Sequence, residues 1–250
     1  MAAIQRLLPH ESLVYLGDTA RVPYGNKSAD TILRYTEECC AFLAKKDVKA
    51  IVVACNTASA HGFPYLTRKF HFPIMGVIEP GVQTALETTR NKQIGVIGTL
   101  ATIGSEVYTK EIQKREPKAV VTSRACPLFV PLVEEGWLDN EVAELVARKY
   151  LDGLQSSGMD ALILGCTHYP LLKPIIAKVL GEKVTLVDSA EAVAHALKKV
   201  LLERGCLAPS APKVPGTFVE LFVTDLPARF ETIAKRFLGG DMPAVKRVTL

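Results

Sequence analysis

Two short segments of the chain place a cysteine at the end of an apolar run, with a threonine close behind it. KAIVVACNTAS (49–59) contains Cys55, and DALILGCTHYP (160–170) contains Cys166. In open α/β sheets, ligands bind outside the carboxyl ends of the strands, which is where both thiols are expected. A helix beginning directly after each cysteine would supply N–H groups that lower the pKa of the thiol and bind a carboxylate. A single cysteine in such a position is more often a small buried apolar residue. The matched pair instead favours two thiols that approach one ligand from opposite sides.

Apolar runs alternate with amphipathic segments along most of the chain. Strands are predicted at 12–17, 49–54, 74–77, 93–98, 118–122, 160–165, 183–187 and 218–223. Helices are predicted best at 30–46, 80–90, 102–116, 139–157, 170–180 and 189–204. The pattern of 139–157 is expected to place one apolar face on the helix, formed by Val142, Leu145, Val146, Tyr150 and Leu154. This alternation predicts an α/β fold of parallel sheets with helices on both faces.

Composition excludes several classes of protein. The 250 residues are 48% apolar with a mean hydropathy of +0.19, which is not typical of a disordered chain. No uncharged apolar run reaches the roughly 18 residues of a membrane span. The net charge of +4 is spread along the chain, so no nucleic-acid partner is expected. The N-terminus lacks the apolar core of a signal peptide, which predicts a cytoplasmic protein.

The remaining motifs give no sign of a metal or a cofactor. The six cysteines form no C-x-x-C pair and no cluster with zinc-ligand spacing, so they are expected to be free thiols. GVIGTLATIG (95–104) is rich in glycine but matches neither a dinucleotide-binding nor a Walker spacing. APSAPKVPG (208–216) is predicted to be an irregular loop.

Seven motifs carry a family resemblance that extends over essentially the whole chain. They are YLGDTARVPYG (15–25), ACNTAS (54–59), GVIEPG (76–81), GVIGT (95–99), CPLFVPLVEEG (126–136), GCTHYP (165–170) and VDSA (187–190). With these motifs the chain resembles the glutamate racemases of the cofactor-independent aspartate/glutamate racemase family. The resemblance implies two similar three-layer α/β domains with parallel sheets, related by a pseudo-twofold axis. The expected domains are 1–77 plus 191–250 and 78–190, with the active site in the cleft between them.

The resemblance also implies a reaction and the residues that perform it. The expected enzyme is an isomerase that interconverts L- and D-glutamate and supplies D-glutamate for peptidoglycan. One thiolate removes the α-proton and the opposite thiol returns a proton, which suits a pair of identical groups. The implied catalytic residues are Cys55, Cys166, His168 and Glu134. The implied substrate-binding residues are Tyr24, Gly25, Asn56, Thr57, Thr167 and His168. Asp18 and Thr19 are expected to shape the loop that carries Tyr24. Asn56, Thr57 and Thr167 are expected at helix starts, where hydroxyl, amide and N–H donors converge.

The chain departs from this family at its beginning. The family opens with a strand and a glycine-rich turn that carries an Asp-Ser-Gly motif, whereas this sequence starts inside the helix that follows, at Met1. A strand central to the first sheet is therefore expected to be absent, which would expose pairing edges. Reduced stability and weak or no activity are the expected consequences.

Several alternatives stay open at this point. The chain could be a racemase for aspartate or another amino acid, since two cysteines do not dictate the length of the substrate side chain. It could also be a glutamate-binding form whose catalysis is impaired by the missing segment. A redox dithiol is disfavoured, because the cysteines lack C-x-x-C geometry. The expected partner is a small-molecule substrate, with neither nucleic acid nor membrane, and the family is compatible with a homodimer.

Overall fold

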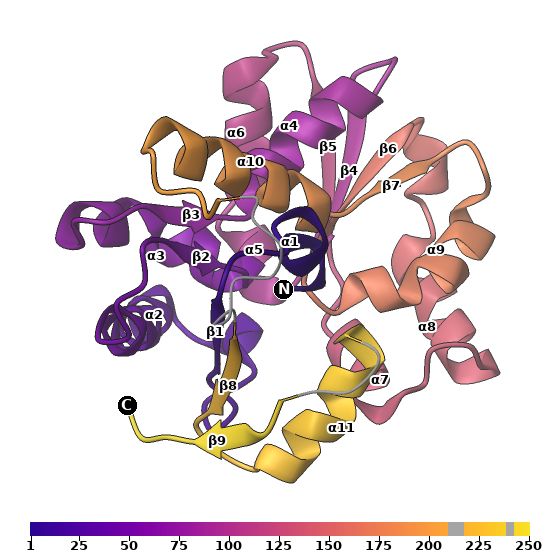
Figure 1. The fold of residues 1–250 in the computed structure, drawn as a ribbon. Helices are drawn as coiled ribbons and strands as arrows, with labels where there is room; N and C mark the ends of the chain where they lie inside the picture. The colour runs from indigo at the N-terminus through magenta and orange to yellow at the C-terminus, as the bar shows by residue number, and fades with distance from the viewer. Residues whose placement is uncertain (210–217, 239–242) are drawn as a thin grey trace.

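The computed structural model describes residues 1–209, 218–238 and 243–250, in which strands and helices alternate (Figure 1). The strands are β1 (Leu13–Gly17), β2 (Ile51–Val53), β3 (Ile74–Gly76), β4 (Gln93–Gly98), β5 (Val120–Ala125), β6 (Ala161–Gly165), β7 (Thr185–Val187), β8 (Val219–Val223) and β9 (Val245–Arg247). The α-helices are α1 (Ala2–Leu7), α2 (Ala29–Ala44), α3 (Asn56–Lys69), α4 (Ile78–Thr88), α5 (Leu100–Gly104), α6 (Val107–Arg115), α7 (Phe129–Glu135), α8 (Glu141–Leu151), α9 (Lys173–Leu180), α10 (Ala190–Glu203) and α11 (Pro227–Leu238). Short 3₁₀ helices are η1 (Tyr24–Asn26), η2 (Gln155–Ser157) and η3 (Tyr169–Leu172).

Every strand pairing in the described part of the chain is parallel. One sheet has the order β5-β4-β6-β7, a second has β1-β8-β9, and a third consists of β2 and β3. Parallel neighbours need long crossover connections, most of which are helices in this fold. The predicted α/β class with parallel sheets is therefore confirmed.

Helices cover both faces of the four-stranded sheet (Figure 1). Along β6, Leu162 and Leu164 face the core formed with α7, α8 and α9, which contains Phe129. Ile163 lies between them and faces the opposite core, which contains Ile112 of α6. This alternation follows from the strand period of two. All five residues of β6 are buried, as expected for an inner strand of a parallel sheet.

Helix α2 packs against both of the smaller sheets. The ring of Phe42 lies edge-on to Phe222 of β8, with ring centroids 5.4 Å apart. Two residues earlier on the same helix, Cys40 packs in a core cluster with Ile51 of β2. One helix therefore spans the two sheets, which places them side by side in one layer.

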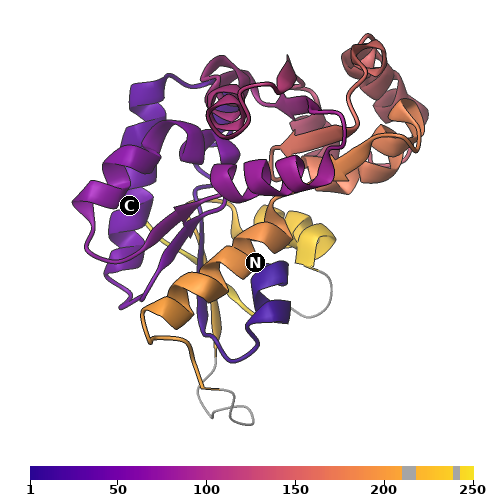
Figure 2. The same cartoon turned by 90° about the horizontal axis from the view of Figure 1, so that it is seen from above.

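The facing edges of β1 and β2 are unpaired among the described residues. β1 pairs with β8 and β2 pairs with β3, and no described strand joins the two sheets. Lys49 and Glu11, two residues before β2 and β1, form an ion pair of 2.6 Å that links the starts of these strands. Helix α1 lies beside α10 (Figure 2), where Leu8 packs with Leu197.

The segment 139–157 differs from its prediction in both length and orientation. Helix α8 ends at Leu151, because Asp152 has an extended ψ of 134°. The residues that it buries are Ala143, Ala147 and Leu151, whereas Val142 and Leu145 are 48% and 68% exposed. The buried stripe thus runs through small alanines, which allow the helix to approach its neighbours closely. The apolar periodicity of a helix does not show whether its small or its larger apolar side chains are the buried ones.

Three other elements differ from the predictions. The helix predicted at 102–116 is interrupted at Glu106, whose φ of 57° separates α5 from α6. The helix predicted at 170–180 begins as the 3₁₀ helix η3 and becomes α-helical only at Lys173. The strand predicted at 118–122 is shifted to Val120–Ala125. Helix α7 and strand β9 were not predicted, since both are short.

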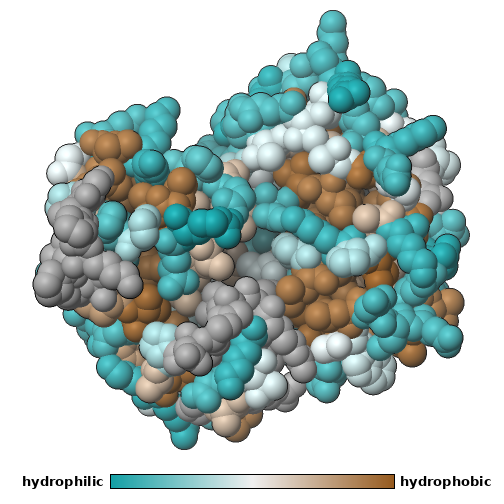
Figure 3. Space-filling model, turned by 45° about the vertical axis from the view of Figure 1, so that its right-hand side comes forward, coloured by the Kyte–Doolittle hydropathy of each residue, from teal (hydrophilic) through white to brown (hydrophobic). Residues whose placement is uncertain are grey.

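The strands lie on either side of the predicted domain boundaries in the sequence. β4 to β7 lie within 78–190, and the other strands lie outside this range. The domain boundaries themselves stay a prediction. The space-filling view shows a notch in the surface between two lobes (Figure 3).

Three sequence predictions concern loops, membranes and metals. Most of the loop predicted at 208–216 lies outside the described residues. No helix in the described ranges is long and apolar enough to cross a membrane. In the same ranges, no three His, Cys, Asp or Glu side chains gather as a candidate metal site.

Candidate active site

Both motif cysteines lie at the carboxyl end of a strand, as predicted. Cys55 follows β2 after one residue and is the N-cap of α3, and Cys166 directly follows β6. Burial raises the pKa of Cys166 to about 12, and negative charge on Cys55 contributes to this rise. This electrostatic coupling places the two thiols at one site, although 110 residues separate them in the sequence.

The surroundings of Cys55 contain the donors that the sequence predicted. The backbone N–H groups of Thr57 and Ala58 and the Thr57 hydroxyl all donate toward its sulfur and favour the thiolate. Burial has a larger effect, however, and the pKa of Cys55 is raised overall. The donors at the helix N-terminus therefore act in the predicted direction, but desolvation of the thiolate outweighs their effect on the pKa.

Cys166 lies beside a histidine and a carboxylate. Its side chain is 6% exposed, and the Nδ1 atom of His168 lies 3.8 Å from its sulfur. The Nε2 atom of the same ring lies 3.4 Å from Oε1 of Glu134, which is on α7. Thr167 Oγ1 lies 3.3 Å from His168 Nδ1. The structure thus brings together four predicted residues: Cys166, His168 and Glu134 form a row from the thiol through the imidazole to the carboxylate, and Thr167 lies beside the imidazole.

Thr167 differs from its predicted environment. It is exposed and lies in a turn, two residues before η3 begins at Tyr169, rather than at a helix start. Its hydroxyl and the backbone N–H groups of His168 and Tyr169 nevertheless favour the thiolate form of Cys166. The turn therefore supplies the donors that were expected from a helix. Asn56 and Thr57 do lie at the start of α3, as predicted.

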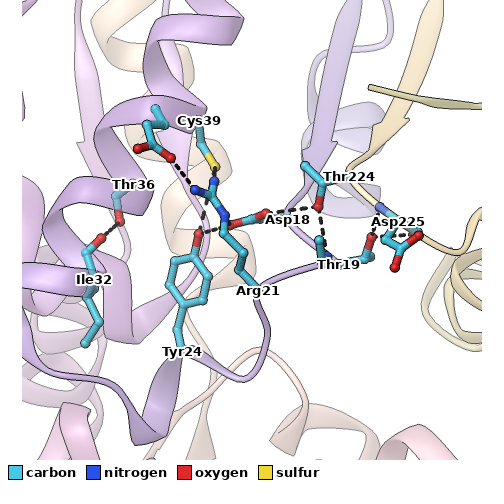
Figure 4. A network of polar contacts seen from close by, with 11 residues as sticks. Asp18, Thr19, Arg21, Tyr24, Ile32, Thr36, Cys39, Thr224 and Asp225 are labelled. Atoms are coloured by element: carbon cyan, nitrogen blue, oxygen red, sulfur yellow. Dashed lines mark hydrogen bonds and ion pairs between the residues drawn. The ribbon is translucent and has the colours of Figure 1, made fainter. Parts of the chain in front are cut away.

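A polar network holds the turn that begins at Tyr24 (Figure 4). The Tyr24 hydroxyl donates to Oδ2 of Asp18, and Arg21 Nε donates to the same oxygen at 2.7 Å. The other oxygen, Oδ1, accepts a hydrogen bond of 3.0 Å from Thr224, which follows β8. Arg21 also pairs with Glu38 of α2. The prediction that Asp18 shapes this loop is confirmed, because its carboxylate bonds to the Tyr24 hydroxyl, to Arg21 and to Thr224.

Three threonine hydroxyls connect this turn to the first cysteine loop. Gly25 packs directly on Thr99, because a Cβ at Gly25 would lie 2.6 Å from Thr99 Cβ. The hydroxyls of Thr57, Thr99 and Thr102 form a closed triangle with sides of 2.9, 3.1 and 3.0 Å. All three threonines are buried.

The sequence reasoning missed Thr99 and Thr102, although one signal pointed to the first of them. Gly98 of β4 pairs in register with Gly165 of β6, so that Thr99 follows its strand at the position where Cys166 follows the neighbouring strand. Residues after neighbouring parallel strands meet at the same edge of the sheet. Strand pairing would therefore have predicted Thr99 beside Cys166.

The other cysteines contribute no predicted chemistry. Cys39 lies on α2, with its sulfur 3.9 Å from the Tyr24 hydroxyl and from Arg21 (Figure 4), and burial raises its pKa to about 11. Cys126 is fully buried, and burial raises its pKa to about 12.

Comparison with known proteins places the whole chain among amino-acid racemases. The Asp/Glu/Hydantoin racemase family model matches residues 1–197. The glutamate racemase of Geobacter metallireducens is 50% identical over 247 residues, which cover 99% of this chain and 90% of that protein. The crystal structure of glutamate racemase isoform RacE1 from Bacillus anthracis superposes with a TM-score of 0.92 at 39% identity, covering 99% of this chain and 91% of that one. The glutamate racemase of Francisella tularensis, solved in complex with D-glutamate, gives a TM-score of 0.91 at 37% identity, with the same coverage.

Proposed function

Because the chain belongs to the Asp/Glu/hydantoin racemase family, we propose that it is a glutamate racemase that interconverts L- and D-glutamate. The proposal is supported by full-length relatives that carry this name. The observation that carries it is the pair of electrostatically coupled thiols, each at the carboxyl end of a parallel strand.

Racemisation by these thiols removes one proton from the α-carbon and returns one proton to its opposite face. The thiolate of one cysteine takes the α-proton, the substrate passes through a carbanion-like state, and the thiol of the other cysteine protonates the opposite face. Cys55 and Cys166 exchange these two tasks when the reaction runs in reverse. Two groups of one chemical type suit a reaction whose substrate and product are mirror images.

One thiol must be ionised before each turnover, although burial favours the neutral form of both. The ammonium group of a bound amino acid adds a positive charge that favours a nearby thiolate. His168, held at Nε2 by Glu134, has Nδ1 facing Cys166 and accepts the proton that this thiol gives up. The N–H and hydroxyl donors around Cys55 do the corresponding work by stabilising the thiolate directly.

The substrate carboxylates need fixed donors at the same site. The backbone of the Tyr24–Gly25 turn, the Asn56 side chain, Thr57 at the start of α3 and the Thr167 hydroxyl would form the site that supplies them. Asn56 and Thr57 are the first two residues of α3, so the first-turn N–H groups, which have no partner within the helix, add to their polarity.

The test is exchange of the α-proton. The chain is incubated with L-glutamate in D₂O, α-deuteration is followed by NMR, and the enantiomers are separated chirally. Deuterated D-glutamate is expected, and it should disappear in Cys55→Ala and in Cys166→Ala. Cys206→Ala, which alters a cysteine outside the site, is the matched control. Near-normal turnover in either of the first two variants would refute the two-base assignment.

The same assay separates the alternatives. Exchange with L-aspartate but not with L-glutamate would identify a different amino-acid racemase. Binding of D-glutamate in calorimetry without α-deuteration would identify a binding form that has lost catalysis. The relatives favour glutamate over both alternatives.

Three finer statements complete the proposal. The D-glutamate would serve peptidoglycan synthesis, the enzyme would act in the cytoplasm, and two copies would form a homodimer. Exposed apolar side chains such as Trp137 and Leu145 are compatible with such an interface. Sedimentation velocity would test the assembly, and a species with the mass of one chain at all concentrations would exclude the dimer.

A further inference from the structure

A buried tyrosine that none of the motifs includes lies between the two cysteine loops. Tyr108, on α6, is 3% exposed. Its hydroxyl donates a hydrogen bond of 2.6 Å to Oδ1 of Asn56, the residue after Cys55. Its ring packs against Gly165, the residue before Cys166, where a Cβ would lie 3.2 Å from Tyr108 Cε2. One side chain thus touches the neighbours of both thiols.

The surroundings of the Tyr108 hydroxyl fix it as a donor. Burial raises the pKa of Tyr108, and negative charge on Cys166 raises it further, so the phenol stays protonated throughout turnover. A neutral phenol can donate its proton to the amide oxygen of Asn56 in every state of the two cysteines. The hydrogen bond therefore does not depend on which thiol is ionised.

This hydrogen bond decides which end of the Asn56 amide remains for a ligand. A side-chain amide carries an acceptor oxygen and a donor NH₂ on opposite branches. With Oδ1 held by Tyr108, the donor branch of the amide is Nδ2, which donates a hydrogen bond to no described residue. Asn56 is itself only 3% exposed, so a rotated amide would leave a buried group badly paired.

We propose that Tyr108 is a positioning residue that locks the Asn56 amide with its NH₂ group available to a substrate carboxylate. This inference rests on the proposed function, because it assigns the amide to glutamate binding. Without the phenol, the amide can turn through 180° and present its oxygen to the carboxylate, which is repulsive. Binding should suffer more than the chemical step, since neither thiol is altered.

The experiment is a double-mutant cycle of Tyr108→Phe and Asn56→Ala. Tyr108→Phe is expected to raise KM for both enantiomers about tenfold, the size of one lost hydrogen bond to a charged group, with a much smaller change in kcat. In the Asn56→Ala background, Tyr108→Phe is expected to change KM less than twofold, because its effect passes through Asn56. Equal effects in both backgrounds would overturn the inference and indicate a packing role.

A matched control and a readout without substrate complete the design. Tyr150→Phe removes a hydroxyl that accepts a hydrogen bond from the Leu128 N–H and is bonded to neither cysteine loop, and it should leave KM unchanged. The Asn56 side-chain NH₂ resonances, assigned by their loss in Asn56→Ala, should shift or broaden in free Tyr108→Phe. Unchanged resonances would overturn the inference. A wild-type chain that neither binds nor racemises glutamate would overturn the proposed function and, with it, the role of the amide. Normal wild-type activity together with an unchanged KM in Tyr108→Phe would overturn this inference alone.

Discussion

Replacing Gly25 by alanine should impair catalysis by moving the turn proposed to bind the substrate away from Thr99. The added Cβ would lie 2.6 Å from Thr99 Cβ, 2.8 Å from its Cγ2 and 3.0 Å from its Oγ1. Ordinary van der Waals contact begins near 3.4 Å, so the turn and Thr99 must separate by about 0.8 Å. The closest of the three contacts is to Thr99 Cβ, which is attached directly to the backbone and does not move away by rotation of the side chain.

Two effects of this separation can be estimated. Overpacking of a buried site costs about 1–3 kcal/mol of unfolding free energy. For a chain of this length, the corresponding fall in Tm is about 2–4 °C for each kcal/mol. A misplacement of about 1 Å can lower catalysis about 100-fold, so kcat/KM should fall by roughly 10- to 100-fold. The loss is expected in both directions, because Gly25 is a proposed binding position and Thr99 bonds to Thr57 beside Cys55.

The assay measures kcat/KM by α-deuteration together with thermal unfolding of each variant. Gly104→Ala is the matched control, because it lies at the end of α5, a few residues from Thr99, and an added Cβ there meets no atom within 4 Å. It should keep full activity. If Gly25→Ala unfolds like the wild type and keeps kcat/KM within twofold of it, the close packing of the turn on Thr99 does not matter for catalysis and the reasoning is refuted.

Three further predictions concern the second thiol, high pH and low pH. His168→Asn should slow racemisation in the direction in which Cys166 acts as the base more than in the reverse direction. Equal losses of rate, measured from L- and from D-glutamate, would show a merely structural histidine. Burial raises the pKa of the Cys40, Cys126 and Cys166 thiols from 9.0 to about 12, so they stay protonated in the folded state while the unfolded chain ionises. The stability that they contribute is complete below about pH 9 and is lost as pH rises toward 12, by roughly 1 kcal/mol for each thiol at pH 10. Urea unfolding that is unchanged between pH 8 and pH 10 would contradict this. Partial burial raises the pKa of Asp160, but hydrogen bonds from a threonine hydroxyl and two backbone N–H groups outweigh it and lower this pKa overall. Asp160→Asn should therefore cost about 1–2 kcal/mol at pH 7, and the difference from wild type should shrink as pH falls below about 4, which urea unfolding at both pH values would measure.

The family motifs and the strand pattern predicted most of the fold and the residues at the centre of the candidate site. Strands at the sites of β4 and β6 were predicted within one residue, because short β-branched runs with a period of two are local signals. The helix over 139–157 was placed correctly in outline but with the wrong buried residues. Which side of a helix is buried depends on the elements packed against it, and the sequence of the helix alone does not contain them.

The sequence by itself determined the class of fold, the positions of Cys55 and Cys166 at strand ends, and the family to which the chain belongs. Only the tertiary structure decided the environment of those thiols. Their pKa values are raised rather than lowered, because burial is a property of the packed site and outweighs the helix donors that local sequence predicts. The contacts of Thr99 with Gly25 and of Tyr108 with Asn56 join residues that are 74 and 52 positions apart. Such contacts arise when separate elements pack together, and no short-range pattern encodes them.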